Sequence, residues 1–132
     1  MDHLEFLNDV NAQKQIDSLA KKYKNKRIVI YGAGIYFQLL MNNFDLSKLN
    51  IVGIADKKFE YNKDSNNTPY IALSPEELNE VNYDVILVAV YNHIQIIEFL
   101  KFRLLINGKN HNKRICQFIK PTLTYFFKTF LH

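Results

Sequence analysis

A chain of 132 residues with 48% hydrophobic and 23% charged residues has the composition of an ordinary globular domain, which excludes a disordered or fibrous protein. Seventeen Lys and Arg against thirteen Asp and Glu give a net charge of +4. The only basic cluster, over residues 21–27, is typical of a solvated helix end, so no nucleic-acid partner is expected.

The location of the protein is predicted from its single cysteine and from the lengths of its apolar runs. Cys116 excludes an intrachain disulfide, which favours a reducing, cytoplasmic compartment. Residues 1–20 lack the apolar run of a signal peptide. The most apolar run, over residues 85–90, is too short to span a bilayer. We therefore expect a cytoplasmic protein with no spanning membrane segment.

The first half of the chain predicts helices and buried strands in alternation. Apolar side chains recur at helical spacing over residues 4–23, which predicts one amphipathic lead-in helix. Two β-branched runs, each stopped by a turn residue, are typical of strands covered on both faces. The strands are expected over residues 27–31 and 51–55, with a helix over 35–44 and an exposed loop over 57–67.

The second half continues the same alternation. Ser74 and Glu77 form the ends of a capping-box sequence around Pro75, which predicts the start of a short helix. Gly108 is placed to end a long helix. Three further strands are expected over residues 70–72, 84–90 and 114–119, and two helices over 75–81 and 94–106.

Strands that alternate with helices imply right-handed crossovers and a parallel sheet. We predict an α/β, three-layer Rossmann-like fold: a parallel five-stranded sheet in the order 3-2-1-4-5, with helices on both faces. Residues 1–132 then form one domain, with a lead-in helix (1–25), a core (26–120) and an aromatic C-terminal tail (121–132). The tail is expected to cover the edge of the sheet, to join a partner subunit or a second copy, or to lie on a membrane surface.

The turn after the first strand is the leading candidate for a binding site. Gly32 closes the strand, Gly34 lets a phosphate approach the backbone, and the next helix offers free N–H groups. Asp56, which ends the second strand 24 residues past Gly32, is placed to accept hydrogen bonds from ribose hydroxyls. Phe37 stands at the third glycine position of the G-x-G-x-x-G pattern. The alternative is that the glycines only make a tight turn, with Asp56 as an ordinary turn carboxylate.

Other polar residues are expected at the same edge of the sheet. Lys57 and Lys58 could meet a 2′-phosphate or a diphosphate, although loop lysines are usually solvated. Tyr91 and Asn92 follow the fourth strand and could contact a base or a sugar. His93 is a weak candidate for a general acid or base, and its alternative role is to cap a helix. Cys116 is interpreted as a buried, inert thiol. No pair of residues has the spacing of a metal site, so no metal is predicted.

Four segments together resemble a known group of proteins: RIVIYGAGIY (27–36), IVGIADKK (51–58), TPYIALSPEEL (68–78) and YDVILVAV (83–90). They resemble the small Rossmann-like domains of bacterial surface-polysaccharide and glycan biosynthesis. These include the N-terminal domains of sialic-acid and bacillosamine-type acetyltransferases and of membrane nucleotide-sugar dehydratases. The resemblance covers about residues 26–120. Acetyl transfer is not implied, because the hexapeptide repeats of those enzymes are lacking in this sequence.

The resemblance implies a nucleotide-type ligand: a nucleotide sugar such as a UDP-sugar, NAD(P) or CoA. It implies that Asp56 contacts a hydroxyl of the ligand and that Tyr91 and Asn92 form a further wall of the ligand site. The phosphates would lie near Gly32, Ala33, Gly34, Ile35 and Tyr36.

The sequence is therefore compatible with three functions. The first is a nucleotide-binding module that holds a nucleotide sugar or NAD(H) in cell-surface glycan synthesis. The second is a small NAD(P)-dependent nucleotide-sugar oxidoreductase, with His93 or Tyr91 beside the transferred hydride. The third is a degenerate structural domain. No complete catalytic motif is present: the Tyr/Lys pair of short-chain dehydrogenases, G-x-S-x-G and the P-loop are all missing.

Overall fold

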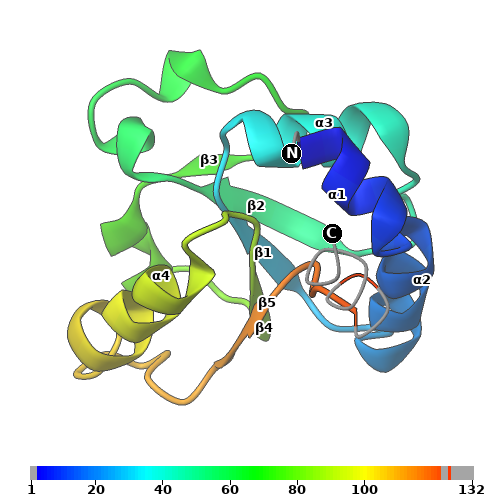
Figure 1. Ribbon diagram of the computed structural model, residues 1–132. Coiled ribbons are helices and arrows are strands. Elements are labelled where there is room, and N and C mark those ends of the chain that lie inside the picture. Colours follow the sequence, from blue (N-terminus) through cyan, green and yellow to red (C-terminus); the bar gives the residue numbers. More distant parts are fainter. Residues whose placement is uncertain (1–2, 123–124, 126–132) are drawn as a thin grey trace.

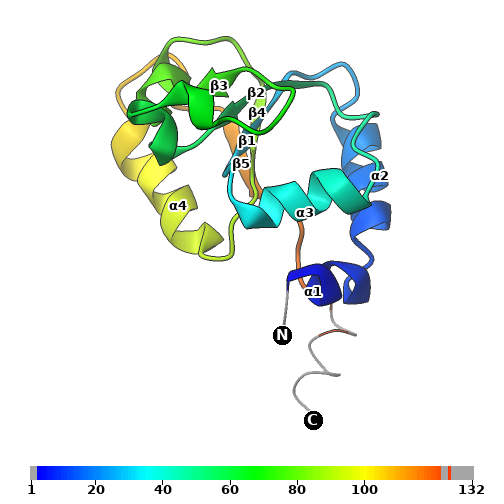
Figure 2. The same ribbon diagram turned by 90° about the horizontal axis from the view of Figure 1, so that it is seen from above.

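A five-stranded parallel sheet forms the centre of the molecule, in the order β3-β2-β1-β4-β5. The computed structural model describes residues 3–122 and residue 125. Helices α1, α2 and α3 lie on one face of the sheet and α4 lies on the other (Figures 1 and 2). The predicted α/β class, strand order and coverage of both faces are confirmed.

The strands are short, and the central ones are completely covered. All residues of β1 and β4 are buried, which explains why their sequences are continuously apolar rather than alternating. Tyr31, the last residue of β1, is in register with Ala55 and Val88, so three strands end at one edge. The strands are β1 (Ile28–Tyr31), β2 (Ile51–Ala55), β3 (Ala72–Leu73), β4 (Val85–Val88) and β5 (Arg114–Gln117).

The lead-in segment contains two helices, so the prediction of a single helix over residues 4–23 is wrong. Helix α1 (His3–Asp9) and helix α2 (Ala12–Lys22) are separated at Asn11, whose φ of 59° is left-handed. Asparagine tolerates this conformation better than most residues. The apolar spacing continues through the break because both helices pack on the same core, and it therefore hides the break in the sequence.

Helix α3 (Ile35–Asn43) packs on the same face as α1 and α2. Phe37, the residue at the third glycine position, is fully buried and lies against the ring of Tyr70, with centroids 6.2 Å apart. Its ring therefore fills the core between α3 and the loop before β3.

The opposite face is covered by the short 3-10 helix η3 (Pro75–Asn79), by α4 (His93–Phe99) and by the π-helix η4 (Leu100–Leu104). The predicted start of η3 is confirmed, since the Glu77 carboxylate accepts hydrogen bonds from the amide (3.0 Å) and hydroxyl (3.1 Å) of Ser74. A second core forms here between the sheet and buried leucines of these helices and of the segment that follows η4.

The segment between β2 and β3, predicted as an exposed loop, contains the 3-10 helices η1 (Lys57–Glu60) and η2 (Lys63–Ser65). Phe59 of η1 is only 2% exposed and belongs to the core, so this part of the prediction is wrong. The aromatic tail lies outside the described residues except for 121, 122 and 125. Tyr125 contacts the ring of Phe6 edge-on, with centroids 5.0 Å apart.

Cys116 is only partly buried, which corrects the prediction of a buried thiol. Strand β5 is at the edge of the sheet, so its side chains have fewer neighbours than those of a central strand. The Cys116 sulfur lies 3.4 Å from the hydroxyl of Tyr23.

Candidate functional site

The glycine turn after β1 lies against the segment that follows β4. Gly32 has a φ of +118°, a conformation that side chains rarely allow, and its amide donates to the carbonyl of Ala55 at 2.8 Å. A Cβ atom placed on Gly32 would approach both the carbonyl oxygen of Ala89 and the side chain of Val90 to 2.7 Å. Only glycine fits this position, because the turn and the end of β4 are in direct contact.

The next residue of the turn is held on both sides by residues that follow β2. The amide of Ala33 donates to Oδ2 of Asp56 at 2.7 Å, and the carbonyl of Ala33 accepts from Nζ of Lys58 at 2.9 Å. Oδ1 of Asp56 accepts from the amide of Lys58 at 3.0 Å. Asp56 therefore stabilises the turn itself. Each of its oxygens keeps a second acceptor position, so a contact with a ligand hydroxyl stays a prediction.

The start of α3 is open. Gly34 precedes the helix with no side-chain cap among the described residues, and no atom lies within 4 Å of a Cβ placed on it. The first amides of a helix have no partner within the helix and carry a partial positive charge. Ile35 is 66% exposed at this end. The backbone after Gly34 is thus accessible to a negatively charged group, whereas that of Gly32 and Ala33 is already bonded.

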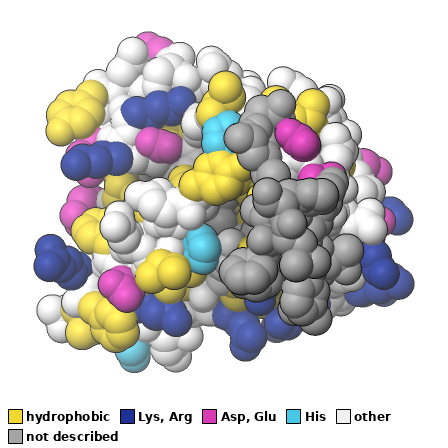
Figure 3. Space-filling view, viewed as in Figure 1, with side chains coloured by type: hydrophobic (Ala, Val, Ile, Leu, Met, Phe, Trp, Pro, Cys, Tyr) yellow, Lys and Arg dark blue, Asp and Glu magenta, His cyan; other side chains and the backbone are white. Residues whose placement is uncertain are grey.

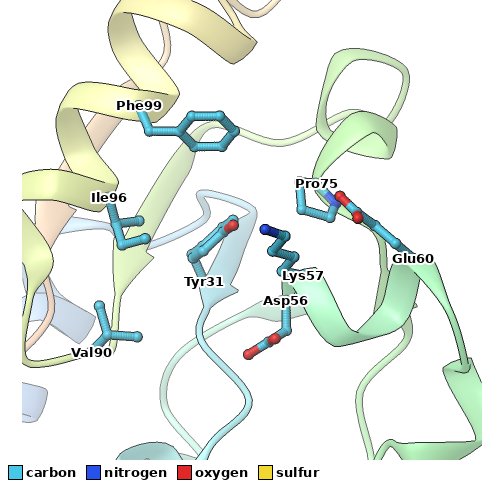
Figure 4. Close-up of a pocket in the computed structure, with 8 residues that line it drawn as sticks. All are labelled: Tyr31, Asp56, Lys57, Glu60, Pro75, Val90, Ile96 and Phe99. Atoms are coloured by element: carbon cyan, nitrogen blue, oxygen red, sulfur yellow. The ribbon is translucent and has the colours of Figure 1, made fainter.

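A cavity of about 380 Å³ opens beside the turn, at the carboxyl ends of β1, β2 and β4. This is the point where the strand order reverses, which is the usual ligand site of open α/β sheets. In Figure 4 the aliphatic and aromatic side chains from β4 and α4 face charged side chains from the end of β2 and η1, with the ring of Tyr31 between them. The lining residues are Tyr31, Asp56, Lys57, Glu60, Pro75, Val90, Ile96 and Phe99.

Tyr31 supplies a neutral hydrogen-bonding group to this cavity. Burial, together with smaller contributions from the carboxylates of Asp56 and Glu60, raises the pKa of the Tyr31 phenol to about 12. The phenol therefore stays protonated at neutral pH and can donate. With the ammonium of Lys57 and two carboxylates, the site offers donors and acceptors on one side and apolar surface on the other.

Tyr91 lies toward α1 and α3 and does not line the cavity. Its ring is 4.4 Å from that of His3, 5.2 Å from that of Tyr36 and 5.9 Å from that of Phe6, measured between centroids. Burial raises the pKa of Tyr36 far above its usual value, with a smaller contribution from Tyr91. This aromatic cluster packs the first turn of α3 against α1 and the segment that follows β4.

Asn92 and His93 lie at the start of α4, and neither lines the cavity. The side-chain amide of Asn92 donates to Oε1 of Gln95 at 3.4 Å. Nδ1 of His93 lies 3.1 Å from the carbonyl of Tyr91 and 3.2 Å from Nε2 of Gln117. These contacts hold the histidine to the residue before its helix and to the end of β5; neither of them caps an amide of α4, whose N-cap residue is Asn92.

The structure thus brings Asp56 and Lys57 together at the cavity, next to the predicted phosphate turn. Six lining residues were not predicted from the sequence. Tyr31 could have been found because it is the last residue of β1 and carries a hydroxyl group. The place of the helical side chains in the cavity depends on how α4 packs on the sheet. The six residues are Tyr31, Glu60, Pro75, Val90, Ile96 and Phe99.

Metal sites and membrane-spanning helices are both lacking in the part of the chain that the structure describes. No group of three or more His, Cys, Asp or Glu side chains among residues 3–122 and 125 is arranged to hold a metal ion. Over the same residues, no helix has the length and apolar character needed to cross a bilayer.

Comparison with known proteins gives one match. No curated protein and no solved structure matches the chain. The family model described as C2185-like, N-terminal, matches residues 24–115, which include the glycine turn and all the residues that line the cavity. Because this match covers more than half of the sequence, the chain belongs to the C2185-like N-terminal domain family.

Proposed function

We propose that this domain is a nucleotide-binding module that holds a nucleotide sugar or NAD(H) at the carboxyl edge of its sheet. The observation that carries the proposal is the cavity at the end of β1, next to the uncapped start of α3. An apolar wall, a few polar groups and a helix start that can accept phosphate are what a nucleotide needs.

The size of the cavity favours one nucleoside-sized group rather than a whole dinucleotide. Its volume of about 380 Å³ is at the low end of the range of about 300–1,000 Å³ that small-molecule sites span. In our proposal a flat ring lies between Phe99 and Pro75, where the phenol of Tyr31 donates to it, and Asp56 accepts from a hydroxyl. The phosphates extend past Gly34 toward the first amides of α3.

The cellular part of the proposal rests on the sequence resemblance alone. It assigns the module to cytoplasmic steps of cell-surface glycan synthesis. The sequence carries no complete catalytic motif, so the chemistry would come from a partner or from a further domain.

Isothermal titration calorimetry with UDP, a UDP-sugar, NAD, NADP and CoA tests the proposal. Gly34→Trp should abolish binding, because the indole would cover the start of α3. A Cβ placed on Gly34 meets no described atom within 4 Å, so the substitution begins in open space. Tyr31→Phe should weaken binding and leave the cavity shape unchanged. Ile71→Trp is the matched control, since Ile71 is 69% exposed and does not line the cavity.

The outcomes separate the functions. Tightest binding of a UDP-sugar supports a nucleotide-sugar module. Binding of NAD or NADP with an absorbance change on a sugar substrate would instead support the oxidoreductase. Binding of none of these compounds would favour a structural domain, a role consistent with the bond that Asp56 already makes to the amide of Ala33.

A further inference from the structure

The outward side of α4 and η4 carries a continuous stripe of side chains that we call the α4 stripe. Its members recur at intervals of three and four residues, so they share one side of the helix. Five of them line a single surface hollow: Gln95, Glu98, Phe99, Phe102 and Arg103. Ile106, two residues past the end of η4, is counted with the stripe.

This stripe exposes more apolar surface than a solvated helix needs. Phe102 is 66% exposed, Ile106 49% and Phe99 37%, and the neighbouring Ile94 is 63% exposed. No residue of α4 is fully buried. Figure 3 shows hydrophobic side chains gathered at the lower left, in the region of α4, with acidic and basic side chains between them. Contiguous apolar surface rimmed by charges is typical of an interaction site.

The sequence of the stripe is complementary to itself. Around the midpoint between Leu100 and Lys101, Glu98 is as far from the centre as Arg103, and Phe99 is as far as Phe102. Among the described residues, neither Glu98 nor Arg103 has an ion pair or a side-chain hydrogen bond within the chain.

This symmetry identifies the partner. When two copies of one helix pack antiparallel about a two-fold axis, each residue meets the residue equally far beyond the midpoint in the other copy. We propose that the chain forms a homodimer through the α4 stripe. Glu98 of each copy then faces Arg103 of the other, and Phe99 packs on Phe102. A single asymmetric partner would not require acid and base to be placed symmetrically.

The expected dimer is weak. The twelve residues of α4 and η4 extend over about 18 Å at a rise of about 1.5 Å per residue. A contact of this length buries less than the roughly 1,200–2,000 Å² of a stable complex. We therefore expect a dissociation constant in the micromolar range and a mixture of monomer and dimer.

Sedimentation velocity over a series from micromolar to millimolar protein measures this equilibrium. Phe102→Asp should raise the dissociation constant at least about tenfold, because it places a charge in the centre of the interface. Ile71→Asp introduces the same charge at an equally exposed position elsewhere and should leave the constant unchanged. Circular dichroism verifies that each variant is folded.

A charge exchange tests the symmetry directly. Glu98→Arg and Arg103→Glu should each weaken the dimer, because each places like charges opposite one another, and the double variant should restore it. A wild-type chain that sediments as a monomer throughout would overturn the proposal. So would a double variant no stronger than the single ones, or an Ile71→Asp variant as weak as Phe102→Asp.

Discussion

Two glycines of one turn should lose very different amounts of stability on the same substitution to alanine. Gly32→Ala forces a side chain into a φ of +118° and into atoms 2.7 Å away, one of them the carbonyl oxygen of Ala89. The backbone strain costs about 1–3 kcal/mol. Forcing a methyl group against packed atoms costs about 1–3 kcal/mol more. We expect a loss of about 3 kcal/mol in the free energy of unfolding.

Gly34→Ala is the matched control. Gly34 has a φ of −91°, and a Cβ placed on it meets nothing within 4 Å, so the change should cost less than about 1 kcal/mol. Urea denaturation followed by circular dichroism measures both. With a slope of about 1–3 kcal/mol per molar urea, Gly32→Ala should lower the midpoint by about 1–3 M. Equal midpoints for the two variants would refute the steric reasoning.

Three further predictions concern polar groups outside the turn. Hydrogen bonds from Arg27 lower the pKa of Asp84 to about 2, so this carboxylate stabilises the fold above pH 4 and loses its contribution as the pH falls from about 4 to 2. Asp84→Asn should therefore flatten the decrease of Tm over that interval, and an unchanged slope would exclude the ion pair with Arg27 as the cause of the decrease. The side-chain amide of Asn110, which is only 3% exposed, donates to the carbonyl of Leu78 at 2.8 Å, so Asn110→Ala should lower the free energy of unfolding by about 1–3 kcal/mol. Urea denaturation measures this loss, and a smaller one would mean that water replaces the amide. The phenol of Tyr31, with its pKa of about 12, should titrate above the exposed tyrosines in an absorbance titration at alkaline pH. Tyr31→Phe should lower the amplitude of this late step without removing it, because the phenol of Tyr83 also has a pKa of about 12.

The order of elements could be predicted because each strand is a continuous β-branched run. Residues 28–31 and 85–88 are apolar at every position, as only a strand covered on both faces requires. The break at Asn11 could not be predicted, since the apolar spacing of α1 continues into α2. The π-helix η4 is equally hidden, because it continues α4 without a break and the sequence shows no change of pattern between them.

The parts of the candidate site that could be predicted directly follow a strand: the turn at Gly32 and the side chains of Asp56 and Lys57. The position of Gly32 follows from the end of a strand, and its positive φ agrees with that reasoning. The bond from the amide of Ala33 to Asp56 depends on how closely the β2 end approaches the turn, which no local pattern encodes. The same holds for Ile96 and Phe99, whose place in the cavity wall depends on the angle at which α4 crosses the sheet.

Two glutamines of α2 connect the N-terminal helices to distant parts of the backbone. Gln13 exchanges hydrogen bonds with the backbone of Asp45, and Gln15 does the same with the backbone of Lys120, at distances of 2.8–3.0 Å. Each side-chain amide thus pairs with the backbone N–H and C=O of one residue, as a neighbouring strand would. A truncated protein that began at residue 24, where the family match starts, would leave both backbone segments unpaired and would uncover the apolar surface on which α1 and α2 rest. The family segment therefore lacks two helices that contribute buried side chains to the core.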